Sequence, residues 1–202
     1  AALMLKVADP SGDEVGQGDL LAALDGRGAV RLLAQAGHVT LTQRVLPGGP
    51  DLTRMALGGQ DDAATGVMTD LTLTMQAALR GADLPGLIPL DHWVRGAFGH
   101  AQDSRLPTDL RRLLSWGEGF VTDMVADGSG WTALHGDMHH RNALHDSNLS
   151  WLAIDPKGIL GPTLYDFANM LLNPVPHSAH VRDPARMARQ AGIVADRTGA
   201  QV

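Results

Sequence analysis

The chain has 202 residues, no cysteine and a formal net charge of -6 at pH 7, with 44% hydrophobic and 19% charged residues. Without cysteine it has no disulfide framework, no thiolate metal site and no cysteine nucleophile. A negative chain without a cluster of Lys and Arg is a poor partner for nucleic acid, whose binding depends largely on phosphate neutralisation, and is better suited to a neutral or cationic small molecule.

The hydropathy pattern does not indicate a membrane protein. No run approaches the ~18 apolar residues of a membrane span, and residues 1–6 lack the regions of a signal peptide. We therefore expect a cytoplasmic protein that has no membrane partner, and we expect it to be a monomer.

The first fifty residues predict the order strand, helix, strand, strand. An apolar run at 3–7 that contains one lysine predicts a strand, and residues 13–24 have a weak helical period. A turn leads into a second strand at 29–33, and the alternating residues 39–45 predict a third, which Pro and Gly end at 47–50.

Helices dominate after Pro50. Residues 61–80 and 108–126 have apolar residues at spacings of three and four, and 81–107 predicts a loop with a short helix. We expect the apolar stripe of the second long helix to pack in the core; it comprises Leu110, Leu113, Leu114, Val121, Met124 and Val125. The fold class is α+β, with a small strand-rich part at 1–47 and a larger, mainly helical part at 48–202.

A hairpin is predicted in the second part. Residues 149–154 alternate as a strand does, and Asp146-Ser147-Asn148 is turn chemistry. Folding about this turn brings Asn142, before the first strand, beside Asp155, after the second. One amide oxygen and one carboxylate then converge, and these are ligands that suit Mg²⁺. Asp137, on the loop leading into the hairpin, can serve as a general base.

The same residues resemble a known family. The pattern His135-x-Asp137-x-x-x-x-Asn142, followed by Asp155, is similar to the catalytic loop and metal-binding motif of eukaryotic-type kinases. The longer match resembles the aminoglycoside and hydroxyurea resistance kinases, which include streptomycin 6-phosphotransferases. It comprises residues 135–142, 151–158 and 165–169 ahead of Asn173-Pro174, with further likeness at 26–32 and 46–48.

The resemblance implies a kinase-like fold, ATP and Mg²⁺ as cofactors, and phosphoryl transfer to a hydroxyl group of a small molecule such as a cationic aminoglycoside. In that family pattern Asp137 would accept the hydroxyl proton, Asn142 and Asp155 would hold Mg²⁺, and Lys6 would contact the α- and β-phosphates.

Further roles follow from the same resemblance. Asp166 would brace the catalytic loop, and His135 would have a scaffolding part. The adenine edge would meet the backbone of a hinge formed by Arg44, Val45 and Leu46.

The chain departs from the family pattern in several places. Arg141 stands where a glycine is expected, and the glutamate that should pair with Lys6 is replaced by Gln17 or, one turn earlier, by Glu14. The strands and the phosphate-covering loop that should precede Lys6 are not in the sequence. We therefore expect a fragment, truncated at both ends and poorly active by itself.

Two other functions remain open at this stage. One is a catalytically incompetent kinase-like remnant. The other is a metallohydrolase, since His135, Asp137 and His139 would share one face of an extended segment, with His140 beside them. Gly158, Gly161 and Pro162 are interpreted as turn residues.

Overall fold

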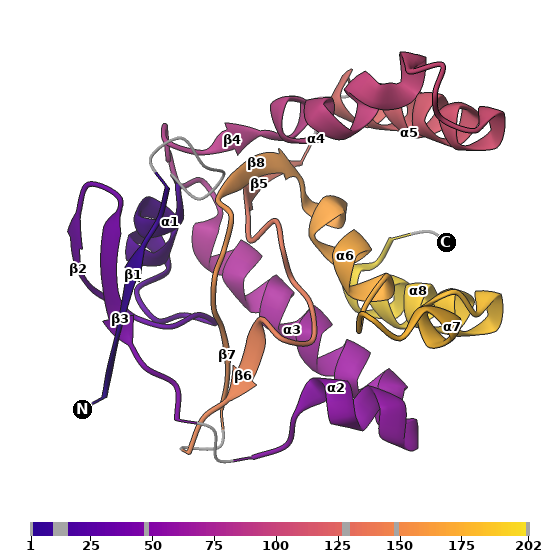
Figure 1. Cartoon of the computed structure of the whole chain (residues 1–202). Coiled ribbons are helices and arrows are strands. Elements are labelled where there is room, and N and C mark those ends of the chain that lie inside the picture. The colour runs from indigo at the N-terminus through magenta and orange to yellow at the C-terminus, as the bar shows by residue number, and fades with distance from the viewer. Residues whose placement is uncertain (1, 10–15, 47–48, 127–129, 148–149, 201–202) are drawn as a thin grey trace.

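The computed structural model describes residues 2–9, 16–46, 49–126, 130–147 and 150–200 (Figure 1). In chain order the elements are β1 (Leu3–Val7), α1 (Gln17–Leu24), β2 (Leu32–Ala36), β3 (Val39–Gln43), α2 (Leu52–Met55), the π-helical turn η1 (Ala56–Gln60), α3 (Asp61–Leu79), β4 (Ile88–Pro89), α4 (Leu90–Phe98), the 3₁₀ turn η2 (Gly99–Gln102), α5 (Thr108–Ala126), β5 (Trp131–Leu134), β6 (Ala143–His145), β7 (Trp151–Ala153), β8 (Ile159–Pro162), the 3₁₀ turn η3 (Thr163–Phe167), α6 (Ala168–Leu171), α7 (Ser178–Val181) and α8 (Pro184–Thr198).

The N-terminal part is an antiparallel sheet with one helix beside it. The strand order is β1-β3-β2, and Lys6 of β1 pairs with Thr40 of β3. The predicted order strand, helix, strand, strand is confirmed, but β2 begins at Leu32 and not at Ala29. Val30 instead donates its backbone N–H to Ala153 at 3.0 Å, so this segment leaves the sheet to join β7.

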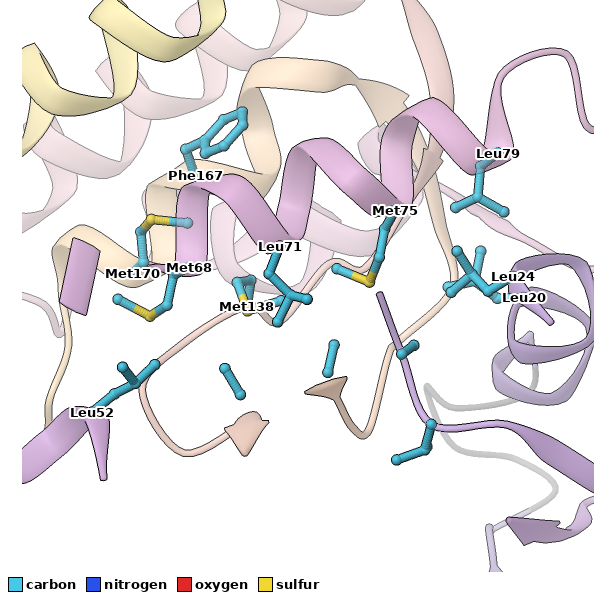
Figure 2. Close-up of a cluster of buried hydrophobic side chains, with 14 of the residues drawn as sticks. Leu20, Leu24, Leu52, Met68, Leu71, Met75, Leu79, Met138, Phe167 and Met170 are labelled. Atoms are coloured by element: carbon cyan, nitrogen blue, oxygen red, sulfur yellow. The ribbon is translucent and has the colours of Figure 1, made fainter. Parts of the chain in front are cut away.

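The core is built around α3 (Figure 2). Met68, Leu71, Met75 and Leu79 of this helix are all buried and face the same side, as their spacing predicts. Full burial of one such side chain contributes about 1.5–3 kcal/mol. The side chains packed around them come from several other elements: Leu20 and Leu24 of α1, Leu52 of α2, Met138 of the loop between β5 and β6, Phe167 of η3 and Met170 of α6.

Two small sheets carry the central part of the chain. The predicted hairpin is confirmed: β6 and β7 are antiparallel, with Ala143 opposite Ala153. In the other sheet, of order β4-β8-β5, Gly161 and Pro162 lie in β8 opposite Thr132 and Trp131, so their interpretation as turn residues is wrong. A side chain at Gly161 would press on Leu90 and Leu134, at 3.1 and 3.3 Å from its Cβ, which explains a glycine inside this strand.

The helix α5 has the predicted bounds but not the predicted burial. It pairs with α4 and projects from the body of the molecule (Figure 1). None of its residues is buried; Leu110, Leu113, Trp116 and Phe120 are exposed, and the last two rings stack at 5.8 Å. The period shows which side of a helix is apolar, whereas burial depends on a second element to cover it. No helix in the described part of the chain has the length and apolarity to cross a membrane.

A buried ion pair fastens α8 to the start of α3. Arg186 is 1% exposed, and its Nε and Nη2 donate to Oδ2 and Oδ1 of Asp61 at 2.6 and 3.2 Å. Its Nη1 donates to the backbone oxygen of Leu171, and its Nη2 donates to the backbone oxygen of Asn173, both at 2.8 Å. The guanidinium therefore holds two helices and the segment after α6 at one point.

Candidate active site

The loop at residues 135–142, which resembles the catalytic loop of kinases and is called by that name below, connects β5 to β6 and makes a sharp turn at Gly136. Gly136 has φ +78°, and an added Cβ would lie 2.6 Å from Cδ1 of Ile159. Both the backbone conformation and the packing therefore require glycine at this position. The turn presents Asp137 immediately after the end of β5.

Asp166 of η3 holds the backbone of this loop. Its Oδ2 accepts the N–H of His135 at 3.0 Å and its Oδ1 accepts the N–H of Gly136 at 2.7 Å. Burial raises the pKa of the Asp166 carboxyl to about 6, although the two backbone donors act in the opposite direction. The carboxylate thus fixes the loop just before Asp137.

His135 is a structural side chain in this geometry. Its Nε2 lies 2.9 Å from the carbonyl oxygen of Ile154, and its Nδ1 accepts the N–H of Asp137 at 3.2 Å. Burial lowers the pKa of the ring to about 4, so His135 is neutral at pH 7. With both nitrogens engaged, it has no lone pair for a metal ion.

The described residues do not form the metal site that the metallohydrolase alternative requires. Among the described residues, no group of three or more His, Asp and Glu side chains is arranged to hold a metal ion. Burial also lowers the pKa of His139, whose Nε2 lies 3.8 Å from Oδ1 of Asp137, so this contact is not an ion pair at neutral pH.

The carboxylate of Asp137 lies between two amides and opens on a small cavity. Asn142 Nδ2 donates to Oδ2 at 3.3 Å and to the Asp137 backbone oxygen at 2.9 Å, and Asn169 Nδ2 donates to Oδ1 at 2.7 Å. The cavity, of about 280 Å³, is also lined by Trp93 and Tyr165. It has room beside the carboxylate for part of a small ring.

Asn142 and Asp155 flank the hairpin as predicted. The Ile154 N–H donates to the Asn142 backbone oxygen at 2.9 Å, which places the residues before β6 and after β7 together. The Asn142 amide nitrogen faces Asp137, which leaves its oxygen as the atom suited to a cation. Asp155 is half-exposed, and its Oδ1 lies 3.2 Å from Nζ of Lys6.

A larger cavity, of about 490 Å³, lies between the N-terminal sheet and the hairpin. Its apolar walls and its polar groups come from both sides of the hinge: Met4, Leu5, Lys6, Gln17, Leu21, Val30, Thr40, Thr42, Gln43, Arg44, Val45, Leu144, Ile154 and Asp155. Arg44 and Val45 therefore line it, while Leu46 is half-exposed and does not. Of the two candidate partners of Lys6, Gln17 is buried at the cavity, and Glu14 lies outside the described residues.

Sequence reasoning did not identify Asn169, Trp93 or Tyr165 as site residues. A signal for Asn169 exists, since it follows Asp166 by three positions and so lies on the same side of a helical turn. Trp93 belongs to α4, whose approach to the catalytic loop depends on tertiary packing alone. Arg141, the departure from the family pattern, is exposed and donates its backbone N–H to Nδ1 of His139 at 3.1 Å.

Comparison with known proteins finds relatives that are named as kinases or phosphotransferases. The chain is 34% identical over 199 residues to the streptomycin 3''-kinase of Klebsiella pneumoniae, covering 97% of this chain and 71% of that protein. It is 31% identical over 176 residues to the hydroxyurea phosphotransferase of Kitasatospora aureofaciens, covering 84% of this chain and 49% of that one. The crystal structure of an aminoglycoside-3'-phosphotransferase of type VIII has the same fold, with a TM-score of 0.62 and 16% identity over 99% of this chain and 78% of that one.

The chain also matches the model of a protein family, and this match covers more of the chain than the sequence matches to single proteins do. Residues 1–201 match the aminoglycoside/hydroxyurea antibiotic resistance kinase family, and with them the loop, the hairpin and both cavities described above. The relatives named above are kinases or phosphotransferases. The chain therefore belongs to the aminoglycoside/hydroxyurea antibiotic resistance kinase family, and its fold is protein-kinase-like.

Proposed function

We propose that this chain carries the site for transfer of the γ-phosphoryl group of ATP to a hydroxyl group of an aminoglycoside, streptomycin being the first acceptor to test. The observation that carries this proposal is the position of Asn142. The side-chain nitrogen of Asn142 donates a hydrogen bond to the proposed base, Asp137. The backbone oxygen of Asn142 accepts the N–H of Ile154, the residue before Asp155. The proposed base, Asp137, lines one cavity and the proposed metal ligand Asp155 lines the other, with Asn142 hydrogen-bonded between them.

The larger cavity suits a nucleotide. Leu21, Val30, Val45 and Ile154 offer apolar walls for a planar base, and the backbone of the hinge at Arg44 and Val45 lies at the same cavity. Lys6 of β1 and Asp155, which follows β7, are charged groups that line this cavity from opposite sides. Lys6 would contact the phosphates, as a lysine on this strand does in kinases.

Asn142 and Asp155 fit a magnesium ion, because one amide oxygen and one carboxylate leave the remaining positions for phosphate oxygens and water. Bound there, Mg²⁺ would neutralise the charge that develops on the phosphates. Asp137 would accept the proton of the acceptor hydroxyl. The oxygen of that hydroxyl would form the new bond to the γ-phosphorus while the bond from the γ-phosphorus to the leaving ADP breaks. Asp166 would keep the loop that presents Asp137 in place.

The smaller cavity is the proposed acceptor site. Trp93 and Tyr165 line it with Asp137. Aromatic faces attract cations, and the negative carboxylate adds to this preference. Both features favour a positively charged acceptor, in agreement with the net charge of -6.

The experiment follows transfer of labelled phosphate from γ-labelled ATP to streptomycin and, in a parallel reaction, to hydroxyurea. We expect a labelled, acceptor-dependent product, and its NMR spectrum then identifies the hydroxyl that was modified. Asp137→Asn should reduce turnover by at least ~10² with little change in ATP affinity. Asp70→Asn, at an exposed carboxylate on α3, is the control and should retain full turnover. No transfer to either acceptor, or unchanged turnover in Asp137→Asn, would contradict the proposal.

A further inference from the structure

The carboxylate of Asp137 receives one side-chain amide on each oxygen, and the two amides come from different elements. Asn142, at the end of the catalytic loop, donates to Oδ2 at 3.3 Å. Asn169, in α6, donates to Oδ1 at the shorter distance of 2.7 Å. One donor allows a carboxylate to swing about its bond to Cβ, whereas two donors on opposite oxygens define its plane.

Asn169 is itself held in one orientation. Asn173 Nδ2 donates to the Asn169 backbone oxygen at 2.9 Å and to its side-chain Oδ1 at 3.3 Å. Because the amide oxygen of Asn169 accepts this bond, its amide nitrogen is turned toward Asp137. The Asn173 backbone oxygen in turn accepts Nη2 of the buried Arg186 at 2.8 Å. A chain of hydrogen bonds therefore leads from the Asp61–Arg186 pair to Oδ1 of Asp137.

Asp166 and Asn169 divide the support of the catalytic loop between them. They lie three positions apart where η3 continues into α6, so both side chains face the loop. Asp166 accepts the backbone N–H groups of His135 and Gly136, and Asn169 contacts the side chain of Asp137. One helical turn thus fixes the backbone before the base and the base itself.

We propose that Asn169 is a positioning residue that orients the Asp137 carboxylate toward the acceptor cavity, which both residues line. The inference rests on the proposed function only in taking Asp137 as the base. A general base works when its oxygen lies within hydrogen-bonding reach of the proton it removes, and a misplacement of about 1 Å can cost ~10²-fold in rate. The contribution of Asn169 therefore belongs to turnover and not to acceptor binding.

The kinetic test uses Asn169→Ala, which removes the donor, and Asn169→Asp, which keeps the shape but replaces the donor with an oxygen. Both should lower kcat by ~10–10²-fold, with KM for the acceptor and affinity for ATP within about threefold of the original values. Asn169→Asp should lower kcat more than Asn169→Ala does, because two carboxylate oxygens would then face each other. A rise in KM with unchanged kcat would assign Asn169 to acceptor binding and overturn the proposal, as would full activity in Asn169→Asp.

A loss of stability must be separated from a loss of orientation. Asp183→Ala removes the N-cap of α8, where Oδ1 accepts the Ala185 N–H at 3.0 Å, and the loss of a helix N-cap destabilises the fold. This variant lies outside the site, so it should lose stability in urea denaturation while kcat stays within twofold. If Asp183→Ala lowers kcat as much as Asn169→Ala does, the effect is one of general stability and the proposal is wrong.

A structural readout keeps this inference independent of the proposed function. In a crystal structure of Asn169→Ala, we expect the Asp137 carboxylate to rotate away from its original plane or to occupy two orientations. That result would support the positioning role even if neither streptomycin nor hydroxyurea were an acceptor. An unchanged, single orientation of Asp137 would overturn it, whatever the acceptor is.

Discussion

The Nζ of Lys6 in β1 lies 3.2 Å from Oδ1 of Asp155, so an ion pair joins the N-terminal sheet to the end of the β6–β7 hairpin. The two side chains are 26% and 49% exposed, and an ion pair so accessible to water contributes at most about 1 kcal/mol to stability. The pair nevertheless places, side by side, the two charges that the proposed function assigns to phosphate and to magnesium.

The first prediction concerns the metal. Asp155→Ala should weaken ATP binding in the presence of Mg²⁺ far more than in its absence, because the carboxylate would act on the nucleotide through the ion. Calorimetric titration with and without Mg²⁺ measures this difference. Asp70→Ala, at an exposed carboxylate remote from the cavity, is the matched control and should leave both affinities unchanged. If Mg²⁺ changes the ATP affinity of Asp155→Ala as much as that of the unchanged chain, Asp155 is not a ligand of the ion.

The second prediction concerns the brace of the catalytic loop. Asp166→Ala leaves the N–H groups of His135 and Gly136 without their acceptors, and an unsatisfied buried donor costs ~1–3 kcal/mol. We expect the free energy of unfolding in urea to fall by about 3 kcal/mol. Asp166→Asn keeps one acceptor oxygen and should lose less. Equal losses in the two variants would show that the hydrogen bonds are not the source of the effect.

The third prediction concerns the buried ion pair. Arg186→Met leaves the Asp61 carboxylate buried without its charged donors and should cost ~3–5 kcal/mol. The double variant Asp61→Leu/Arg186→Met should be more stable than Arg186→Met, because no unpaired charge remains. A double-mutant cycle based on urea denaturation measures the coupling. If the two single losses simply add, the pair is not coupled and this account is incorrect.

The fourth prediction concerns pH. Burial lowers the pKa of His135 and of His140 to about 4, whereas an imidazole in the unfolded chain titrates near ~6.5. The unfolded state therefore binds more protons between these values, and stability falls as the pH falls through this window. Asp166 acts in the opposite direction, since its pKa is raised to about 6 and the folded state takes up its proton first. The loss of stability from the two histidines is larger than the gain from the single aspartate.

We therefore expect a net loss of stability on acidification from pH 7 to pH 5, measured as the midpoint of urea denaturation. His140→Gln removes one of the two buried imidazoles and should make the midpoint less sensitive to pH. Asp166→Asn removes the opposing group and should make it more sensitive. A midpoint that rises on acidification of the original chain would mean that the carboxyl dominates.

The parts of the fold that the sequence predicted are those in which local pattern and local turn chemistry agree. The period of α3, the bounds of α5 and the β6–β7 hairpin all follow from residues close together in the chain. The exposure of the α5 stripe did not follow, because a period identifies an apolar side but not its neighbour. The strand β8 was missed because Gly161 and Pro162 owe their extended conformation to Leu90, Leu134 and the pairing with β5.

The candidate site shows the same division. Asn142 and Asp155 were identified because a hairpin converts a spacing along the chain into proximity, and Asp137 because it lies on the loop that leads into this hairpin. Asn169 and Trp93 were not, because each reaches Asp137 or its cavity from another element. The spacing of three between Asp166 and Asn169 places them on one side of a helical turn, but it does not show that this side faces Asp137. Contacts between distant elements depend on packing, which is a property of the folded chain.

The packing of α1 against α3 restricts how the larger cavity can open. Leu20 and Leu24 belong to the same hydrophobic cluster as Met75 and Leu79, so the core is continuous from α1 to α3 (Figure 2). A wide hinge movement of the N-terminal sheet would carry α1 with it and expose these four side chains to water. A small sliding movement of α1 along α3 would keep them covered. If the larger cavity binds the nucleotide as proposed, we expect exchange to proceed by shear, with the buried surface of α3 nearly constant.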